Sequence, residues 1–339
     1  MDARRPADVR GDGAHLSAPG PTAGLGRVHV IFNPASGRGR GGRRVAGYLE
    51  LLRHYLGAFE HSHTSGPGDE ARLTREAIER GAETIVAVGG DGTWGQVADQ
   101  VVAAGADIRF GILPSGTGND FGRNLGISYE SPEDAVRALA AGRVRRVDVG
   151  RVHSPSAPDR LADRPDAYRP RHFLNVVGFG FDIAVIDMAA RARFLKGALL
   201  YKVTALQQLF RYPGIDAVLS SRLHGARAGR RLIVTISNGR FFGGGFPIAP
   251  GASVDDGLLH ACMIHDTSPL RRAALFNRAE RGRHIGAAEV ELLSDQSFAA
   301  SFADEEPRPR FEIDGDVYVS GDWTIEVAVV PSALEVVVP

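Results

Sequence analysis

The chain has 339 residues, a length typical of two domains that each bury a core of their own. Its 40 basic and 40 acidic side chains balance to a formal net charge of zero, which argues against nucleic acid as a partner, because nucleic-acid binders usually carry a basic surplus. The single cysteine, Cys262, excludes an internal disulfide framework, which favours a cytoplasmic protein. Its apolar neighbours predict a small buried side chain.

Residues 1–26 are rich in glycine, proline, alanine and charge, and we expect them to form a disordered tail. They contain no apolar run long enough for a signal sequence. No window elsewhere reaches the 18 or so uncharged apolar residues of a membrane span. Any contact with a bilayer is therefore expected to be peripheral, at the inner face of the membrane.

Between residues 27 and 150, short β-branched runs alternate with helical patterns. Such alternation predicts strands joined by helical crossovers, and hence an α/β domain with a parallel sheet. The expected strands are 27–33, 58–64, 84–90 and 109–119, and the expected helices are 42–56, 68–82 and 93–105. The runs TIVAV and FGILP are apolar throughout, as strands with two buried faces are.

Residues 151–339 have a different character and predict a β-rich second domain. Segment 154–171 holds four prolines and many charges, which is typical of a surface loop. Antiparallel strand patterns follow at 230–238, 258–266, 290–294, 309–315, 322–330 and 333–338. Two packed domains of this kind commonly bind a ligand in the cleft between them. A homodimer is compatible with this organisation.

One long helical pattern, at 187–211, interrupts the strands of the second domain. It combines apolar residues with a series of basic ones: Arg191, Arg193, Lys196, Lys202 and Arg211. This composition suits an anionic membrane surface, and it equally suits the solvated face of a packed helix.

Three of the predicted strands in the first domain end in glycine-rich loops, at 33–40, 89–96 and 114–120. Ligands of open parallel sheets lie beyond the carboxyl ends of the strands, where glycine turns and helix N-termini offer N–H groups to anions. The three loops together predict a phosphate-bearing ligand, although the common P-loop and dinucleotide fingerprints are absent. Asp91, between two glycines, is an unusual neighbour for phosphates unless a divalent cation accompanies them.

The motifs NPASG, VGGDGTWGQV, GILPSGTGNDFGR and RVDVG, followed by FLNVVGFGFDIAV, GASVDDGLL and FEIDGD, resemble in order and spacing the diacylglycerol kinase catalytic-domain family. The resemblance extends from about Val28 to the C-terminus. It implies a two-domain fold like that of NAD kinase, ATP between the domains, and Mg²⁺-dependent transfer of a phosphoryl group to a lipid hydroxyl.

Matching motifs carry the family's ATP-contacting positions onto this chain. They are Asn33, Pro34, Ala35, Ser36, Gly37, Thr64, Gly90, Asp91, Gly92, Thr93, Trp94, Gly95, Gln96 and Thr117. Among these, Trp94 also has the simpler interpretation of a packing residue at the start of a helix. His61 and His63 are not expected to bind a metal, because no cysteine lies near them in the sequence.

The resemblance also implies a structural magnesium site in GASVDDGLL, formed by the Asp256 side chain and the backbone carbonyls of Ser253 and Leu258. Asp120 and Asp148 are candidates for an acidic network between that ion and the nucleotide. From the residues alone a plain hairpin is the simpler interpretation, since Asp-Gly is a strong turn signal.

The segment FEIDGD likewise predicts a two-residue hairpin turn at Asp314-Gly315. In the family this place carries an Asp-Gly-Glu motif whose acids accept the proton of the substrate hydroxyl, so we expect Asp314, Asp316 and Asp91 to be the catalytic carboxylates. Here the shorter Asp316 replaces the usual glutamate, and Asp314 or Asp316 could be the base.

A second departure from the family pattern lies just after GGDGT. Where the family commonly has asparagine and glutamate, this chain has Gly95 and Gln96. Two alternatives to a lipid kinase follow. One is a kinase for a soluble acceptor such as NAD, whose family shares the GGDG loop. The other is a catalytically weak nucleotide-binding regulatory protein.

Overall fold

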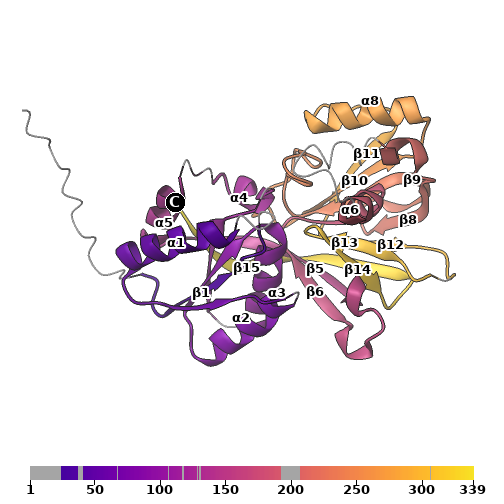
Figure 1. The fold of residues 1–339 in the computed structure, drawn as a ribbon. Coiled ribbons are helices and arrows are strands. Elements are labelled where there is room, and N and C mark those ends of the chain that lie inside the picture. Colours follow the sequence, from indigo (N-terminus) through magenta and orange to yellow (C-terminus); the bar gives the residue numbers. More distant parts are fainter. Residues whose placement is uncertain are drawn as a thin grey trace, which may run out of the picture.

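A computed structural model of the chain describes residues 24–36, 41–66, 68–105, 107–116, 118–127, 129, 131–191, 207–305 and 307–339. These residues form two lobes that long strands connect (Figure 1). The first lobe contains β1 (Val28–Phe32), α1 (Gly41–Leu56), β2 (Glu60–His63), α2 (Asp69–Glu79), β3 (Thr84–Gly89), α3 (Asp91–Ala104), β4 (Arg109–Pro114), α4 (Asp120–Asn124) and α5 (Pro132–Ala140).

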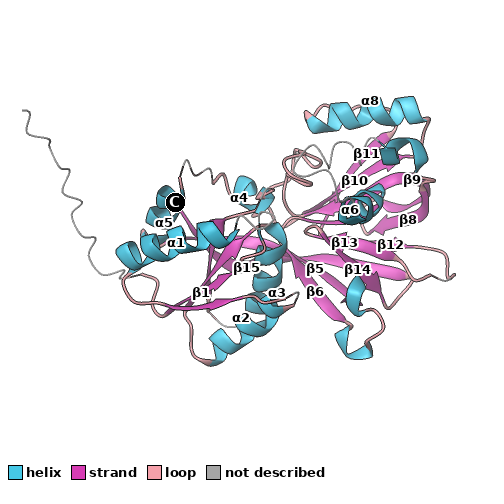
Figure 2. Ribbon diagram, viewed as in Figure 1, coloured by secondary structure: helices cyan, strands magenta, loops and turns pink. Residues whose placement is uncertain are grey.

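The strands of the first lobe pair in the order β2–β1–β3–β4, all in parallel. Helices α2 and α3 cover one face of this sheet, and α1 and α5 cover the other (Figure 2). The alternation of side chains along β1 serves both layers, because Val30 and Phe32 join the α1 side and Ile31 joins the α2 and α3 side. The predicted strands and helices of this lobe are confirmed within a few residues, except that the strand predicted over 109–119 ends at Pro114. Helices α4 and α5 were not predicted.

The second lobe contains β5 (Arg143–Pro158), β6 (Arg169–Phe173), β7 (Val176–Gly180), α6 (Phe181–Arg191), β8 (Ile215–Ser221), β9 (Gly225–Ser237), β10 (Leu259–His265), α8 (Pro269–Glu280), β11 (Val290–Asp295), β12 (Ser297–Ser301), β13 (Arg310–Ile313), β14 (Asp316–Ser320) and β15 (Thr324–Val338). Antiparallel pairing runs through β15–β12–β8–β9–β7–β13–β14–β5, and β5 pairs again with β15. The sheet therefore closes on itself as a barrel, filled by side chains such as Phe179, Phe298 and Phe311.

Two long strands make the lobes continuous. Strand β15 runs antiparallel to β5 in the barrel and parallel to β4 at Glu335 and Val336, so one sheet extends through both lobes. The segments predicted as separate strands, 322–330 and 333–338, form this single strand, with an irregularity at Ser332, whose φ is 52°. The boundary predicted near residue 150 falls within β5.

The loop predicted over 154–171 is wrong at both ends. Strand β5 continues to Pro158 and β6 begins at Arg169, and the short 3-10 helices η2 (Asp159–Leu161) and η3 (Pro165–Ala167) lie between them. We call residues 158–172 the arm. The two ends of the loop become strands because β5 pairs with β14 and β6 pairs with β5. The pairing with β14 joins segments far apart in the chain, and the proline-rich sequence does not indicate it.

Cys262 is fully buried in the second lobe, as predicted. The predicted helix 187–211 overlaps α6, but residues 192–206, with most of its basic side chains, lie outside the described residues. In the described part of the chain, no helix combines the length and apolar character needed to cross a membrane.

Candidate functional site

The carboxyl ends of β1, β3 and β4 meet at one edge of the parallel sheet, and side chains tie their loops together. Asn33 Nδ2 donates to Glu70 Oε1 at 3.0 Å and to Thr93 Oγ1 at 2.9 Å. The hydroxyls of Ser36 and Ser115 lie 2.6 Å apart. The predicted loops therefore form one connected surface of backbone N–H groups and hydroxyls at the end of the sheet.

The glycines of these loops are required by close packing. A Cβ on Gly116 would stand 2.5 Å from Gly90 Cα, and one on Gly90 would stand 3.1 Å from Gly116 Cα. The two loops thus touch backbone to backbone, a distance that only glycine allows. This contact holds the third loop against the second at the carboxyl edge of the sheet.

Asp91 is the first residue of α3 and joins the same two loops. Its Oδ1 accepts the backbone N–H of Phe121 at 3.1 Å, at the start of α4. Its Oδ2 faces Gly118, where a Cβ would stand only 2.6 Å away. Burial, followed by the charge of Asp120, raises the pKa of Asp91 to about 6. The carboxylate is therefore poised near neutral pH, with one oxygen in a glycine-lined space.

The Asp314-Gly315 hairpin is confirmed, and it brings the second group of acids to the first. Both turn residues have positive φ, 48° and 93°, and Ile313 pairs with Asp316 across the turn. Asp314 is 6 % exposed, and its carboxylate accepts the N–H groups of Leu174, Asn175 and Val176 at 2.7, 2.8 and 3.1 Å. Burial raises the pKa of Asp314 to about 7 although these bonds oppose the shift.

Asp316 lies on the opposite side of the turn and meets α3. Gln96 Nε2 donates to Asp316 Oδ2 at 2.8 Å, and Gly92 lies beside the same carboxylate. Burial raises the pKa of Asp316, while Gln96 and the charge of Arg160 lower it. The structure thus brings together Asp91, Asp314 and Asp316, although more than 200 residues separate the first from the other two in the sequence.

A cavity of about 310 Å³ opens between the lobes beside these residues. Its first wall is Gly92, Gly95 and Gln96 of α3, its second is Asp314 and Asp316, and its third is the arm. The arm was predicted only as a surface loop. The signal that could have indicated its role is the density of arginines in an otherwise proline-rich segment.

The arm presents a basic wall to the cavity. Arg169 forms an ion pair with Asp99 of α3, and Arg171 donates to Ala167 O at 2.7 Å and lies over the Tyr318 ring. Burial would raise the pKa of Asp99, but bonds from His172 and Arg169 hold it at about 2. Arg160, in contrast, forms no hydrogen bond or ion pair with the described residues, and its charge faces Asp316 and Glu70.

The predicted magnesium residues come together in a turn that leads into β10. The Asp256 carboxylate accepts the N–H groups of Ser253 at 3.2 Å and Leu258 at 3.0 Å and lies 3.0 Å from His260 Nε2. Asp148 joins this turn by accepting the N–H of Gly257 at 2.7 Å. The plain hairpin interpretation is wrong, because β9, the strand that pairs with β10, already ends at Ser237, so the Asp256-Gly257 turn does not join two strands directly.

The residues of this turn fit a magnesium ion. The Asp256 side chain is 27 % exposed, and a carboxylate with backbone oxygens is a donor set that Mg²⁺ accepts. No three His, Cys, Asp or Glu side chains form a metal-binding cluster among the described residues. An ion here would therefore depend on backbone carbonyls and water as well as on Asp256.

Several predicted ATP residues lie away from the cavity or outside the described residues. Gly37 and Thr117 belong to the latter group. Trp94 is 1 % exposed, and its Nε1 donates to Ala87 O at 3.1 Å, so its side chain belongs to the core and not to the cavity wall. Thr64 directly follows β2, where its N–H donates to Phe32 O, and it does not line the cavity.

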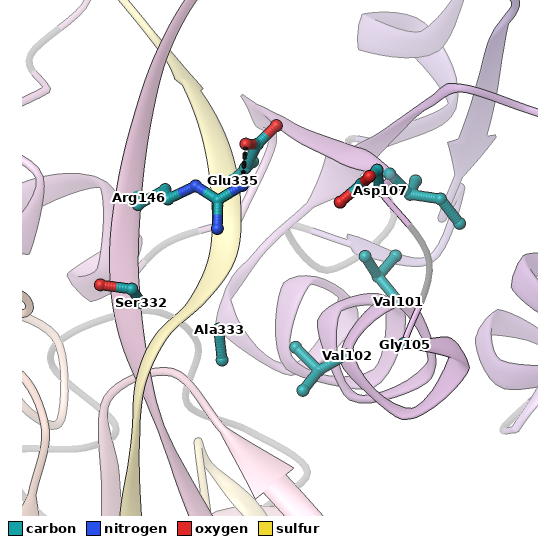
Figure 3. A pocket seen from close by; sticks show the side chains of 9 residues that line it. Val101, Val102, Gly105, Asp107, Arg146, Ser332, Ala333 and Glu335 are labelled. Carbon is teal, nitrogen blue, oxygen red and sulfur yellow. Dashed lines mark hydrogen bonds and ion pairs between the residues drawn. The ribbon is translucent and has the colours of Figure 1, made fainter.

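A second cavity, of about 150 Å³, lies at the C-terminal end of α3 (Figure 3). Val101 and Val102 face Ala333 and the ion pair between Arg146 and Glu335, whose atoms lie 2.7 Å apart. None of the predicted site residues lines it. The first cavity is therefore the candidate active site.

Comparison with known proteins covers nearly the whole chain. Residues 27–152 match the diacylglycerol kinase catalytic domain, and residues 175–338 match the YegS C-terminal NAD kinase beta sandwich-like domain. The diacylglycerol kinase of Mycobacterium tuberculosis H37Rv is 28 % identical over 93 % of this chain and 96 % of its own length. A protein of Chromohalobacter salexigens named probable lipid kinase YegS-like is 30 % identical over 80 % of this chain and 83 % of its own.

A solved structure agrees with this assignment at the level of the fold. The crystal structure of a diacylglycerol kinase from Bacillus anthracis superimposes with a TM-score of 0.63, at 18 % identity, over 92 % of this chain and 97 % of that one. Together with the matched domains and the two-lobe architecture, the comparisons show that the chain belongs to the diacylglycerol kinase catalytic-domain family.

Proposed function

We propose that this protein transfers the γ-phosphoryl group of ATP to the hydroxyl group of a lipid, either diacylglycerol or a sphingoid-type acceptor, with Mg²⁺ as the metal. The observation that supports it best is that Gly92 and Gly95 of α3 meet the Asp314 and Asp316 carboxylates at one cavity between the lobes, directly beside the loops that Asp91 joins. Phosphoryl transfer depends mainly on positioning and on charge neutralisation, which is what such a convergence provides.

The nucleotide would lie across the ends of β1 and β3, with its phosphates against the loops at 33–37 and 90–96. The connected Asn33, Thr93, Ser36 and Ser115 side chains hold these loops in place. From the arm, Arg160, which forms no ion pair with the described residues, lines the cavity beside these loops. Magnesium, when bound, neutralises charge on the phosphates. Asp91 would orient that ion through water, and Asp256 would hold the structural one.

Asp316 is the acid that we assign as the proton acceptor. Both acids line the cavity, but the Asp314 carboxylate already accepts three backbone N–H groups, whereas Asp316 accepts one bond, from Gln96. In the reaction the acceptor hydroxyl gives its proton to Asp316, and its oxygen bonds to the γ-phosphorus. The bond from that phosphorus to the bridging oxygen breaks, and ADP leaves.

A transfer assay tests this function directly. Labelled ATP and Mg²⁺ would be supplied with vesicles that contain diacylglycerol, ceramide or sphingosine, and separately with NAD. We expect label in a lipid product. Transfer to NAD alone would favour the soluble-acceptor alternative, and tight ATP binding without transfer would favour a regulatory protein. We also propose a cytoplasmic protein that contacts the membrane surface peripherally to reach its substrate.

A further inference from the structure

A second pair of buried acids lies directly behind the hairpin that carries Asp314 and Asp316. Glu312 is on β13, two residues before the turn, and Asp182 is in the first turn of α6. They are 1 % and 5 % exposed, on the outer face of the barrel where α6 packs. Neither is part of the cavity, so the proposed reaction does not use them as substrate-binding groups.

Gly178 brings the two carboxyl groups together. It pairs with Glu312 across β7 and β13, so the two residues share a face of the sheet. A Cβ on Gly178 would stand 1.9 Å from Asp182 Oδ2 and 3.0 Å from Glu312 Oε1. The space left by the missing side chain is therefore occupied by both carboxyl groups, one from the helix and one from the strand.

These carboxyl groups have almost no other partners. Both oxygens of Asp182 and Oε1 of Glu312 are buried, and within the described part of the chain no side chain or well-aligned N–H group donates to them. The N–H groups of Asp182 and Ile183, in the same turn of α6, are the only donors near the Asp182 carboxyl there, and they oppose the rise in its pKa that burial causes. Thr235, which pairs with Gly178 from the other side, has a buried hydroxyl that is also unpartnered. Two adjacent ionised carboxylates without hydrogen bonds are strongly unfavourable in such a place, whereas one proton between them satisfies both.

The remaining oxygen of Glu312 reaches the catalytic hairpin. Its Oε2 accepts the N–H of Gly315 at 2.7 Å, the central amide of the turn between Asp314 and Asp316. A proton held between Oε1 and Asp182 fixes the orientation of the Glu312 carboxyl and keeps Oε2 aimed at Gly315. If both acids were ionised, their repulsion would push the Glu312 carboxylate away from Gly178 and break its hydrogen bond with Gly315 N–H.

We propose that Asp182 and Glu312 share one proton and act together as positioning residues for the Asp314–Gly315–Asp316 turn.

Among the described residues, no cation faces the pair in a way that would replace the proton. From the turn, Asp314 and Asp316 add negative charge, and from the segment after α6 the neutral Tyr212 faces Asp182. Arg310, the nearest cation on the same face of β13, is engaged by Asp187 of α6 and Asp159 of the arm. Burial and then the charge of Asp182 raise the pKa of Glu312 well above its usual value.

The stability of the protein as a function of pH tests the shared proton without reference to activity. Glu312→Gln keeps the shape, the acceptor for Gly315 and a donor for Asp182, but it does not lose a proton as pH rises. Wild type keeps a proton that its unfolded chain releases above pH about 4.3. The melting temperature of Glu312→Gln relative to wild type should therefore increase steadily from pH 5 to pH 8.

Two comparisons make this measurement decisive. Asp182→Asn should give the same trend, and Glu335→Gln, which removes a partly exposed carboxylate paired with Arg146, should not. A difference between Glu312→Gln and wild type that stays constant or shrinks as pH rises would overturn the shared proton. Because folding alone is measured, this result stands even if the proposed kinase activity is not found.

The positioning role rests on the proposed function and is tested by kinetics at pH 7. Glu312→Ala leaves Gly315 N–H unpaired, and we expect kcat to fall about a hundredfold, the effect of misplacing a catalytic group by about 1 Å. Glu312→Gln should restore most of that loss, which a requirement for charge would not allow. If folded Glu312→Ala turns over like wild type, or if Glu312→Gln is as impaired as Glu312→Ala, the positioning role is wrong.

Discussion

Gln96 Nε2 donates a hydrogen bond to Asp316 Oδ2 at 2.8 Å, across a separation of 220 residues in the chain. These are two of the three positions where the chain departs from the family pattern, which has glutamate at both. The third, Gly95, lies against Asp314, the other acid of the hairpin. The three departures are therefore neighbours in space. The Gln96 amide donates to the short Asp316 side chain, at two positions where the family pattern has glutamate.

The first prediction concerns the charge at position 96. Gln96→Glu would place a second carboxylate against Asp316, whose pKa burial already raises. Like charges raise each other's pKa by about one unit or more. Because Asp316 must be ionised to accept a proton, the acid limb of the kcat profile should move to higher pH by a similar amount. Gln296→Glu, at an exposed position, is the control. An unchanged acid limb would exclude Asp316 as the base.

The two acids of the hairpin should respond differently to loss of charge. Asp316→Asn should lower kcat by about 10²–10⁴, the usual contribution of a general base, with little change in the melting temperature. Asp314→Asn turns an amide toward three backbone N–H groups and should reduce the free energy of unfolding by roughly 1–3 kcal/mol. Denaturant unfolding and single-turnover kinetics on both variants separate the roles. Equal stability of the two variants would contradict this division.

Much of the first lobe could be predicted because its signals are local. The apolar run at 84–90 and the helical pattern that begins near Thr93 each lie within one element, and the glycine loops follow directly from them. The Asp314-Gly315 turn was predictable for the same reason, since turn chemistry depends on adjacent residues.

The remaining features depend on contacts between distant segments. The barrel closes only because β5 pairs with β15, and no local pattern encodes that partner. The sequence of the arm predicts a loop because its prolines and charges outweigh its strand signal. Its position depends on a distant contact, the ion pair between Arg169 and Asp99 of α3. Trp94 had two interpretations, and only burial in the fold decided between them.

The third prediction concerns the glycine at position 95. A Cβ there would lie 3.0 Å from Asp314 Oδ2, and Asp314 cannot move away because three backbone N–H groups hold it. Alanine normally stabilises a helix over glycine, yet here we expect Gly95→Ala to cost about 1–3 kcal/mol of unfolding free energy. Gly47→Ala, in α1 with nothing near its Cβ, should instead gain about 0.5–1 kcal/mol. A stabilised Gly95→Ala would show that the Asp314 contact is not tight.

The last prediction concerns the arm as a wall of the proposed nucleotide site. Arg160 has no bonded partner among the described residues, lies 3.9 Å from where a Cβ on Gly68 would stand, and faces the cavity with its charge. A guanidinium beside the N-terminus of α2 is well placed to bind a phosphate. We expect Arg160→Ala to weaken ATP binding about tenfold, the loss of one charge-assisted hydrogen bond.

Direct titration with ATP and Mg²⁺ measures this effect without an acceptor lipid. The matched control is Arg164→Ala, because Arg164 lies on the same arm but forms an ion pair with Asp166. The side chains of Arg164 and Asp166 are both largely exposed. The difference in ATP affinity between wild type and Arg160→Ala should shrink as salt is added, since the contact is electrostatic and open to solvent. If Arg160→Ala and Arg164→Ala bind ATP equally well, the arm shapes the cavity but does not contact the nucleotide's phosphates.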